Sequence, residues 1–153
     1  MKTPEIYEGR GVDFEQLVAK ALDQHGLRGA NADPKTPVIL QTFSETTARK
    51  LAAMKVGVPI VLLLGNGKGW ESPARVNEWK TIVQGFGPSK TIVERNPRLV
   101  EWAHAAGMTV VPYTFRSSNT GNFASVRAEM EQFLYTYNVD GLFTDNPDQF
   151  PRR

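Results

Sequence analysis

The chain has 153 residues, long enough for one domain with its own hydrophobic core. Hydrophobic residues make up 41% and charged residues 22%, and the formal net charge of +2 is too small to mark a nucleic-acid-binding protein. The absence of cysteine excludes disulfides, thiolate metal sites and a cysteine nucleophile, and no apolar run is long enough to cross a membrane.

The first regular element is an expected helix over residues 14–25. Asp13 is placed to cap it, with Gln16 as the capping-box partner, and Gly26 is placed to end it. One face of this helix is apolar and is expected to be buried; it consists of Phe14, Leu17, Val18, Ala21 and Leu22.

Two apolar runs follow, at residues 37–43 and 59–65. Both have the length and composition of buried strands. Between them Ser44 is placed to cap a helix over residues 45–55. The pattern predicts a strand, a helix and a second strand.

A glycine-rich stretch, residues 65–70, leads to the pair Ser72 and Pro73. These two are a typical N-cap and first-turn pair, and they predict a helix over residues 74–83. The next segment, residues 87–93, is ambiguous and has some character of a short strand. The rest of the chain predicts helices over 98–106 and 123–137, strands over 108–115 and 139–145, and a last short turn over 146–150.

The predicted strands are almost continuously apolar and alternate with helices. That pattern is typical of an α/β fold with a parallel sheet covered by helices. No linker or low-complexity tract divides the sequence, so we expect residues 1–153 to form one domain.

Four segments together resemble the glycerophosphodiester phosphodiesterases, particularly the bacterial periplasmic-type branch. They read KTPEIYEGRGVDFEQLV, PVILQTFSETTARKLAAM, LVEWAHAAGMTVVPYTFR and YNVDGLFTDNPDQF, and the last two are the most specific. The resemblance implies a (βα)₈ TIM barrel, of which this chain is expected to be the C-terminal half, with about four βα units.

The same resemblance implies hydrolysis of glycerophosphodiesters to sn-glycerol 3-phosphate and an alcohol, with one divalent metal, usually Ca²⁺ or Mg²⁺. Family members use a His-Arg pair, a Glu-x-Asp, a further His and a Glu-x-Lys. Here Lys2 matches the motif lysine, and the metal-binding Glu would lie one residue before Met1. The sequence therefore predicts an inactive fragment without catalytic residues, metal ligands or a bound metal.

Five residues are candidates for contact with substrate. Lys2 either sits near the phosphate as a point charge or is solvated. Gln41 and Phe43 end a predicted strand, and the carboxyl ends of barrel strands border the active site. Tyr113 and Phe115 end another strand and could form the wall of a pocket, although one of the two is expected to belong to the core.

Other polar features favour structural roles. The glycine-rich stretch 65–70 lacks the spacing of a phosphate-binding loop, which favours a plain loop. Arg116 could meet an anion or solvent.

Asp145 and Asp148 suggest a metal site, but Asp145 is better explained as the cap of the last turn. His25 and His104 lack a nearby partner in sequence and are expected to be structural.

The alternative function is that of a non-catalytic half-barrel that binds a phosphate-containing ligand or a partner half. The expected partners are the glycerophosphodiester substrate, and the missing N-terminal half or a second copy. Neither nucleic acid nor a membrane span is expected. The family branch is often periplasmic or secreted, but the first residues have no apolar segment typical of a signal peptide.

Overall fold

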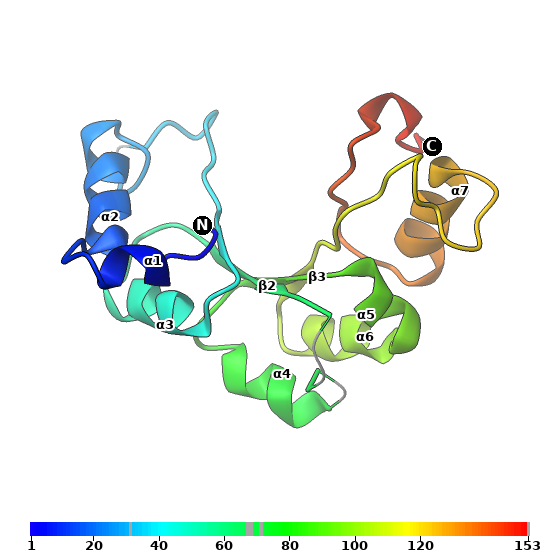
Figure 1. The fold of residues 1–153 in the computed structure, drawn as a ribbon, viewed down its shortest axis with the longest axis horizontal. Coiled ribbons are helices and arrows are strands. Elements are labelled where there is room, and N and C mark those ends of the chain that lie inside the picture. The colour runs from blue at the N-terminus through cyan, green and yellow to red at the C-terminus, as the bar shows by residue number, and fades with distance from the viewer. Residues whose placement is uncertain (31, 67–68, 71, 153) are drawn as a thin grey trace. The chain divides into compact units, whose positions relative to one another are not determined.

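The computed structural model describes residues 1–30, 32–66, 69–70 and 72–152. The chain divides into two compact units, which are described separately (Figure 1). Unit 1 comprises Met1–Leu63 and Thr81–Gln84, and unit 2 comprises Leu64–Lys80 and Gly85–Arg153.

Unit 1 consists of helices around a parallel strand pair. Its strands pair with Leu40 opposite Ile60, and the side chains of Asp13 and Ser44 cap two of its helices by accepting from the backbone N–H groups three residues on. Its elements are α1 (Glu5–Glu8), α2 (Phe14–Gln24), β1 (Leu40–Thr42), α3 (Glu45–Ala53) and β2 (Ile60–Leu64), the last residue of which belongs to unit 2.

The buried face of α2 differs from the expected apolar face. Leu17 is 53% exposed and Ala21 is exposed, whereas Glu15, Ala19 and Leu22 are buried. Glu15 can be buried because it accepts hydrogen bonds from α3, and a hydrophobicity pattern cannot detect this. The expectation for Leu17 and Ala21 was therefore wrong.

Unit 2 contains the second parallel pair, with Gly85 opposite Thr109, and a core that includes Phe86, Phe115 and Phe133. The rings of Phe115 and Phe133 meet edge to face, with centroids 4.8 Å apart. Its elements are α4 (Pro73–Trp79), β3 (Gly85–Pro88), α5 (Lys90–Arg95), α6 (Arg98–Ala105), β4 (Thr109–Val110), α7 (Val126–Glu131), a π-helical turn (Gln132–Thr136) and a 3₁₀ turn (Pro147–Gln149).

The strands are shorter than predicted. The run 37–43 is a strand only at Leu40–Thr42, and 108–115 only at Thr109–Val110. The run 139–145 forms no strand but joins Phe115 through a parallel bridge at Thr144. A strand needs a continuous ladder of hydrogen bonds, and an apolar run alone does not provide one.

Other element boundaries also differ from the expected ones. The ambiguous segment 87–93 contains the end of β3 and the start of α5. The helix expected over 123–137 starts at Val126, because Ser125 caps it, and continues as a π-helical turn. The helix expected over 74–83 ends at Trp79.

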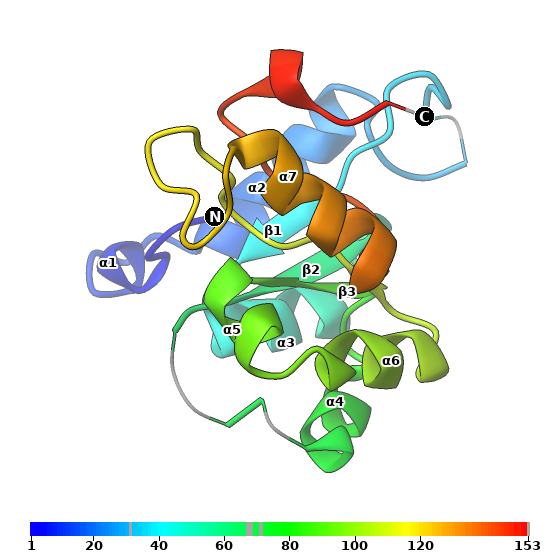
Figure 2. The same ribbon diagram turned by 90° about the vertical axis from the view of Figure 1, so that its right-hand side faces the viewer.

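Both strand pairs are parallel. Strands and helices alternate along the chain, as Figures 1 and 2 show for β1 to β3. The predicted α/β fold with parallel strands is therefore confirmed. No helix in the described part of the chain is both long and apolar enough to span a membrane.

Candidate functional site

In unit 1 the N-terminal segment lies against the carboxyl end of β1. The Met1 ammonium donates a hydrogen bond to the backbone carbonyl of Gln41. This contact places Lys2, whose side chain is exposed, next to the strand end that carries Gln41. Two of the residues predicted from sequence are thus close together in this unit.

Three further side chains lie at the same strand end. The hydroxyl of Ser44 lies within hydrogen-bond reach of Glu5 and is the main cause that lowers the pKa of this carboxyl group. Phe43 is 41% exposed. The carboxyl end of β1 therefore presents polar, anionic and aromatic groups.

In unit 2 a group of three residues, the strand-end cluster, consists of Asn66, Ser89 and Tyr113. Ser89 Oγ donates to Asn66 Oδ1 at 2.5 Å, and the Tyr113 hydroxyl donates to the carbonyl of Leu64 at 3.0 Å. Ser89 and Tyr113 also form a parallel bridge. Burial raises the pKa of the Tyr113 phenol, which keeps it a neutral donor.

Lys90, the residue after Ser89 of the strand-end cluster, forms a largely buried ion pair with Glu129. Lys90 Nζ donates to Glu129 Oε1 at 2.6 Å and to the carbonyl of Asn119 at 2.7 Å. It also lies 5.8 Å from the centroid of the Phe115 ring. Because Glu129 compensates its charge, Lys90 is suited to hold the loop at Asn119 in place rather than to bind an anion.

The second predicted aromatic and the arginine after it have structural contacts. Phe115 is fully buried, which favours the core role that the sequence allows for one of the pair Tyr113 and Phe115. Arg116 Nε donates to Asp145 Oδ2 at 2.5 Å. The expectation that Asp145 caps the last turn was wrong: this turn has Asn146 at its N-cap, without a side-chain cap.

The histidines have structural positions. His104 Nε2 lies 3.0 Å from Asp140 Oδ2, and the same oxygen accepts from Val110 N at 2.7 Å. The partner of His104 thus lies 36 positions away in sequence, and this contact fits the structural role expected of His104. His25 is the exposed residue at the C-cap of α2.

Sequence reasoning missed Ser89, Lys90 and Glu129. The first two follow the short run Gly85–Pro88, and recognising that run as a strand would have placed them at a strand end. No local signal identifies Glu129 as the partner of Lys90. In the glycine-rich stretch 65–70, residues 67 and 68 lie outside the described residues, so the plain-loop prediction stays a prediction there.

The metal that the family resemblance implies does not fit this chain's own residues. Among the residues that the structure describes, no three His, Asp or Glu side chains come together as metal ligands. We therefore assign no metal ligand here, and no catalytic step is derived through a metal.

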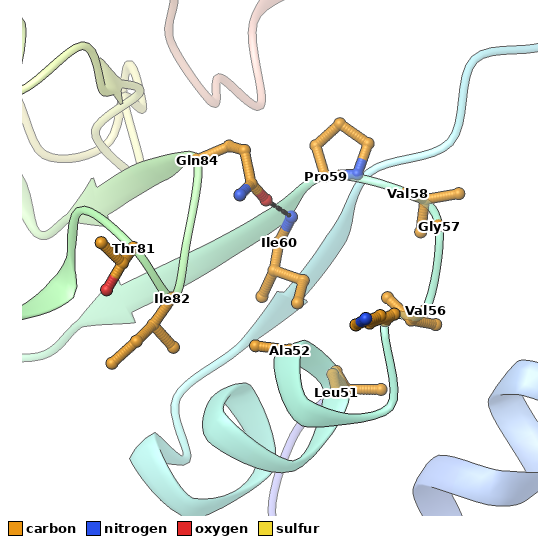
Figure 3. Close-up of a pocket in the computed structure, with 11 residues that line it drawn as sticks. Leu51, Ala52, Val56, Gly57, Val58, Pro59, Ile60, Thr81, Ile82 and Gln84 are labelled. Carbon is orange, nitrogen blue, oxygen red and sulfur yellow. Dashed lines mark hydrogen bonds between the residues drawn. The ribbon is translucent and has the colours of Figure 1, made fainter.

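A pocket of about 370 Å³ lies in unit 1 at the amino end of β2 (Figure 3). Gln84 Oε1 accepts from Ile60 N at 2.8 Å, and residues of α3 and the segment 56–60 supply a mainly apolar lining. The catalytic groups of (βα)₈ barrels lie at the carboxyl ends of the strands. This pocket is therefore not the candidate active site.

Comparison with known proteins gives a consistent result. Residues 3–149 match the Glycerophosphoryl diester phosphodiesterase family. The chain is 29% identical over 162 residues to Glycerophosphodiester phosphodiesterase GDPD6 of Arabidopsis thaliana, a match that covers 88% of this chain and 43% of the plant protein.

Among solved structures, the chain resembles a glycerophosphodiester phosphodiesterase from Parabacteroides distasonis. The TM-score is 0.64 at 19% identity, over 90% of this chain and 48% of that chain. This likeness shows the fold, which is the partial (βα)₈ barrel that the sequence predicts. The chain spans less than half the length of either relative. By its sequence match the chain belongs to the glycerophosphoryl diester phosphodiesterase family.

Proposed function

We propose that the protein to which this chain belongs hydrolyses glycerophosphodiesters to sn-glycerol 3-phosphate and an alcohol. The family match over residues 3–149 carries this proposal. In unit 1 we assign substrate contact to Lys2, Gln41 and Phe43, and in unit 2 to Tyr113. A half-buried neutral phenol at a strand end suits the glycerol or alcohol part of a substrate.

We further propose that the chain alone does not catalyse the reaction. Phosphodiester hydrolysis needs charge compensation at the phosphate and groups that move protons. The described residues include no metal-ligand group, and His104 is held by Asp140 rather than placed at a strand end. A divalent metal, Ca²⁺ or Mg²⁺, would be held by residues of the rest of the family's barrel.

The direct test is a turnover assay of the purified chain on glycerophosphocholine with Ca²⁺ or Mg²⁺. We expect no rate above background. A clear rate that depends on the metal would contradict the assignment of the catalytic groups to another part of the barrel.

A fusion of the chain to the N-terminal half of a family member tests the activity itself. We expect the fusion to hydrolyse glycerophosphodiesters, and Lys2→Ala to lower kcat on the order of a hundredfold, because a cation near the developing phosphate charge is lost. Lys20→Ala, an exposed lysine of α2, is the matched control. A folded fusion that is inactive on every glycerophosphodiester would overturn the proposed function.

The alternative, a non-catalytic half-barrel that pairs with a partner half, has one observation in its favour. Ile39, beside β1, is 57% exposed, and Phe43 is 41% exposed. Apolar side chains next to a strand edge suit pairing with another sheet. An active fusion would exclude this alternative as the sole function.

A further inference from the structure

Unit 2 contains a pocket of about 400 Å³ that none of the predicted site residues lines. Its polar lining comes from Ser117, Thr120 and Ser125 of one loop and from Asn146 and Gln149 near the C-terminus. Figure 2 shows the loop in yellow and the turn that contains Gln149 in red. Small-molecule sites have volumes of about 300–1,000 Å³, so this pocket has the size of such a site.

The pocket lies on the same side of unit 2 as Tyr113, the residue of this unit to which we assign substrate contact. The two walls of the pocket continue from two segments that are joined by a parallel bridge between Phe115 and Thr144. Ser117 comes two residues after Phe115, and Asn146 two residues after Thr144. Both walls therefore lie on the carboxyl-terminal side of this bridge, which corresponds to the catalytic side of the strands in (βα)₈ barrels.

Among the residues that the structure describes, no charged residue lines the pocket. Of the neighbouring charged groups, Arg116 and Asp145 bind each other at 2.5 Å, and the carboxylate of Asp148 accepts from Gln149 Nε2 at 2.6 Å, so each of these groups already has a partner. A phosphate or carboxylate would need a cation, and an ammonium group would need a carboxylate or an aromatic face. This lining favours an uncharged ligand.

The two amide side chains present opposite hydrogen-bonding groups. Asn146 Oδ1 accepts from Ser117 N at 2.8 Å, which fixes the amide and leaves its Nδ2 as a donor. Gln149 Nε2 donates to Asp148 Oδ2 at 2.6 Å, which leaves Gln149 Oε1 as an acceptor. The pocket thus offers both a donor and an acceptor.

The hydroxyl groups of Ser125 and Thr120 likewise offer one donor and one acceptor. Ser125 Oγ accepts from Ala128 N at 3.1 Å, so its O–H can still donate. Thr120 Oγ1 donates to Phe123 O at 2.9 Å, so its lone pairs can still accept. An alcohol group both donates and accepts, and several on one carbon frame match this alternation. Apolar contact for the carbon frame comes from the two aliphatic residues of the lining, Ala124 and Val126.

We propose that this pocket binds the polyhydroxylated head group of the substrate, an inositol-like or glycerol-like alcohol, in preference to choline or ethanolamine. The assignment of this ligand as the leaving alcohol rests on the proposed function. The preference of the pocket for neutral polyols does not, because it follows from the lining alone.

The first test is a titration of the ¹⁵N-labelled chain, or of the fusion if the chain alone gives no dispersed amide spectrum. The probes are myo-inositol, glycerol, choline and ethanolamine at matched millimolar concentrations. We expect inositol or glycerol to shift the backbone amide signals of Ser117, Ser125 and Gln149, and the two cations to leave them unchanged. No shift with either polyol, or equal shifts with the cations, would overturn the proposal.

The second test uses the fusion and compares glycerophosphoinositol with glycerophosphocholine. The variant Ser117→Ala/Gln149→Ala should lower kcat/KM about tenfold on the first substrate and leave the second unchanged, since each neutral hydrogen bond contributes about two- to tenfold. Asn122→Ala, in the same loop but outside the pocket, is the matched control.

The outcomes separate the two proposals. Both substrates carry the same glycerol phosphate, so an equal loss on both would assign the pocket to that part and overturn the head-group assignment. If the ratio of kcat/KM on glycerophosphoinositol to kcat/KM on glycerophosphocholine did not change in an active fusion, the head-group assignment would also be overturned. An inactive fusion would overturn the proposed function, while the titration would still decide whether the pocket binds polyols.

Discussion

The ammonium group of Lys90 lies 2.6 Å from Glu129 Oε1, and the Glu129 side chain is fully buried. The other carboxylate oxygen, Oε2, has no hydrogen-bond partner among the described residues. Burial raises the pKa of Glu129 and outweighs the opposing effect of Lys90. The pair therefore joins the start of α5 to α7 at a cost in desolvation.

Removing one partner of this pair should destabilise the chain strongly. Lys90→Met leaves a buried carboxylate without its cation, and the free energy of unfolding should fall by about 3–5 kcal/mol. Lys90→Met/Glu129→Leu should cost clearly less than the single variant, because neither charge remains buried. Urea denaturation followed by circular dichroism measures both.

The matched control is Arg127→Ala, which removes an exposed ion pair with Glu131. It should change the free energy of unfolding by less than about 1 kcal/mol. A Lys90→Met effect as small as this control would show that the buried pair contributes little.

Glu15 gives a prediction for acid stability. Burial alone would raise the pKa of this carboxyl group, but hydrogen bonds from Thr47 and Lys50 hold it below its ordinary value of 4.5. A carboxyl group with a lowered folded-state pKa stabilises the fold above its unfolded pKa, and this contribution is lost as the pH falls through the folded pKa. Stability should therefore decrease below about pH 4.5 in part through Glu15.

The variant Glu15→Gln tests this sign. The difference in unfolding free energy between the unmodified chain and the variant should shrink as the pH falls from neutral to below 4.5. Lys50→Met, which removes one of the two stabilising donors, should reduce the same pH-dependent component. A difference that stays constant with pH would show that Glu15 has the same pKa in both states.

Gly85 should not tolerate a side chain. A Cβ atom at this position would lie 2.3 Å from Thr109 Oγ1 and 2.8 Å from the backbone oxygen of Thr109. The hydroxyl can rotate away, but the backbone oxygen is part of the parallel pair β3–β4. Gly85→Ala should therefore lower the free energy of unfolding by about 1–3 kcal/mol, measured by urea denaturation.

Gly9→Ala is the control, since nothing lies within 4 Å of its Cβ position and its φ is −63°. Its effect should stay within about 0.5 kcal/mol. Equal effects of the two variants would mean that β3 and β4 are farther apart in solution.

Self-association should depend on the edge of β1. Within the described chain β2 is the strand that pairs with β1, and Ile39 beside this edge is 57% exposed. Such edges favour association, so size exclusion with light scattering should show dimers or larger species. Ile39→Lys should shift the population towards monomer.

Leu17→Lys is the matched control, because Leu17 is 53% exposed but lies on a helix. It should leave the association unchanged. A single monomeric peak with cooperative unfolding of the unmodified chain would contradict the half-barrel proposal.

Local features were predictable from the sequence. Asp13 and Ser44 cap the helices expected of them, because an N-cap depends on a side chain and a backbone N–H only three residues apart. The α/β class followed from apolar runs alternating with helical patterns. The family resemblance followed from short strings of residues that need no knowledge of contacts.

The remainder depended on contacts between distant parts of the chain. The burial of Glu15 requires Thr47 and Lys50, and that of Glu129 requires Lys90, 39 positions earlier. Strand lengths likewise depend on which neighbouring backbone groups are in hydrogen-bond reach.

The pair Tyr113 and Phe115 shows the limit of what the sequence could predict. By itself the sequence determined the α/β class with parallel strands, the family, and that one of Tyr113 and Phe115 belongs to the core. Only the tertiary structure decided which one: Phe115 packs edge to face on Phe133, while the Tyr113 hydroxyl reaches the carbonyl of Leu64. Both side chains are aromatic and lie only two residues apart in sequence, so their contacts with distant parts of the chain determine which one is buried.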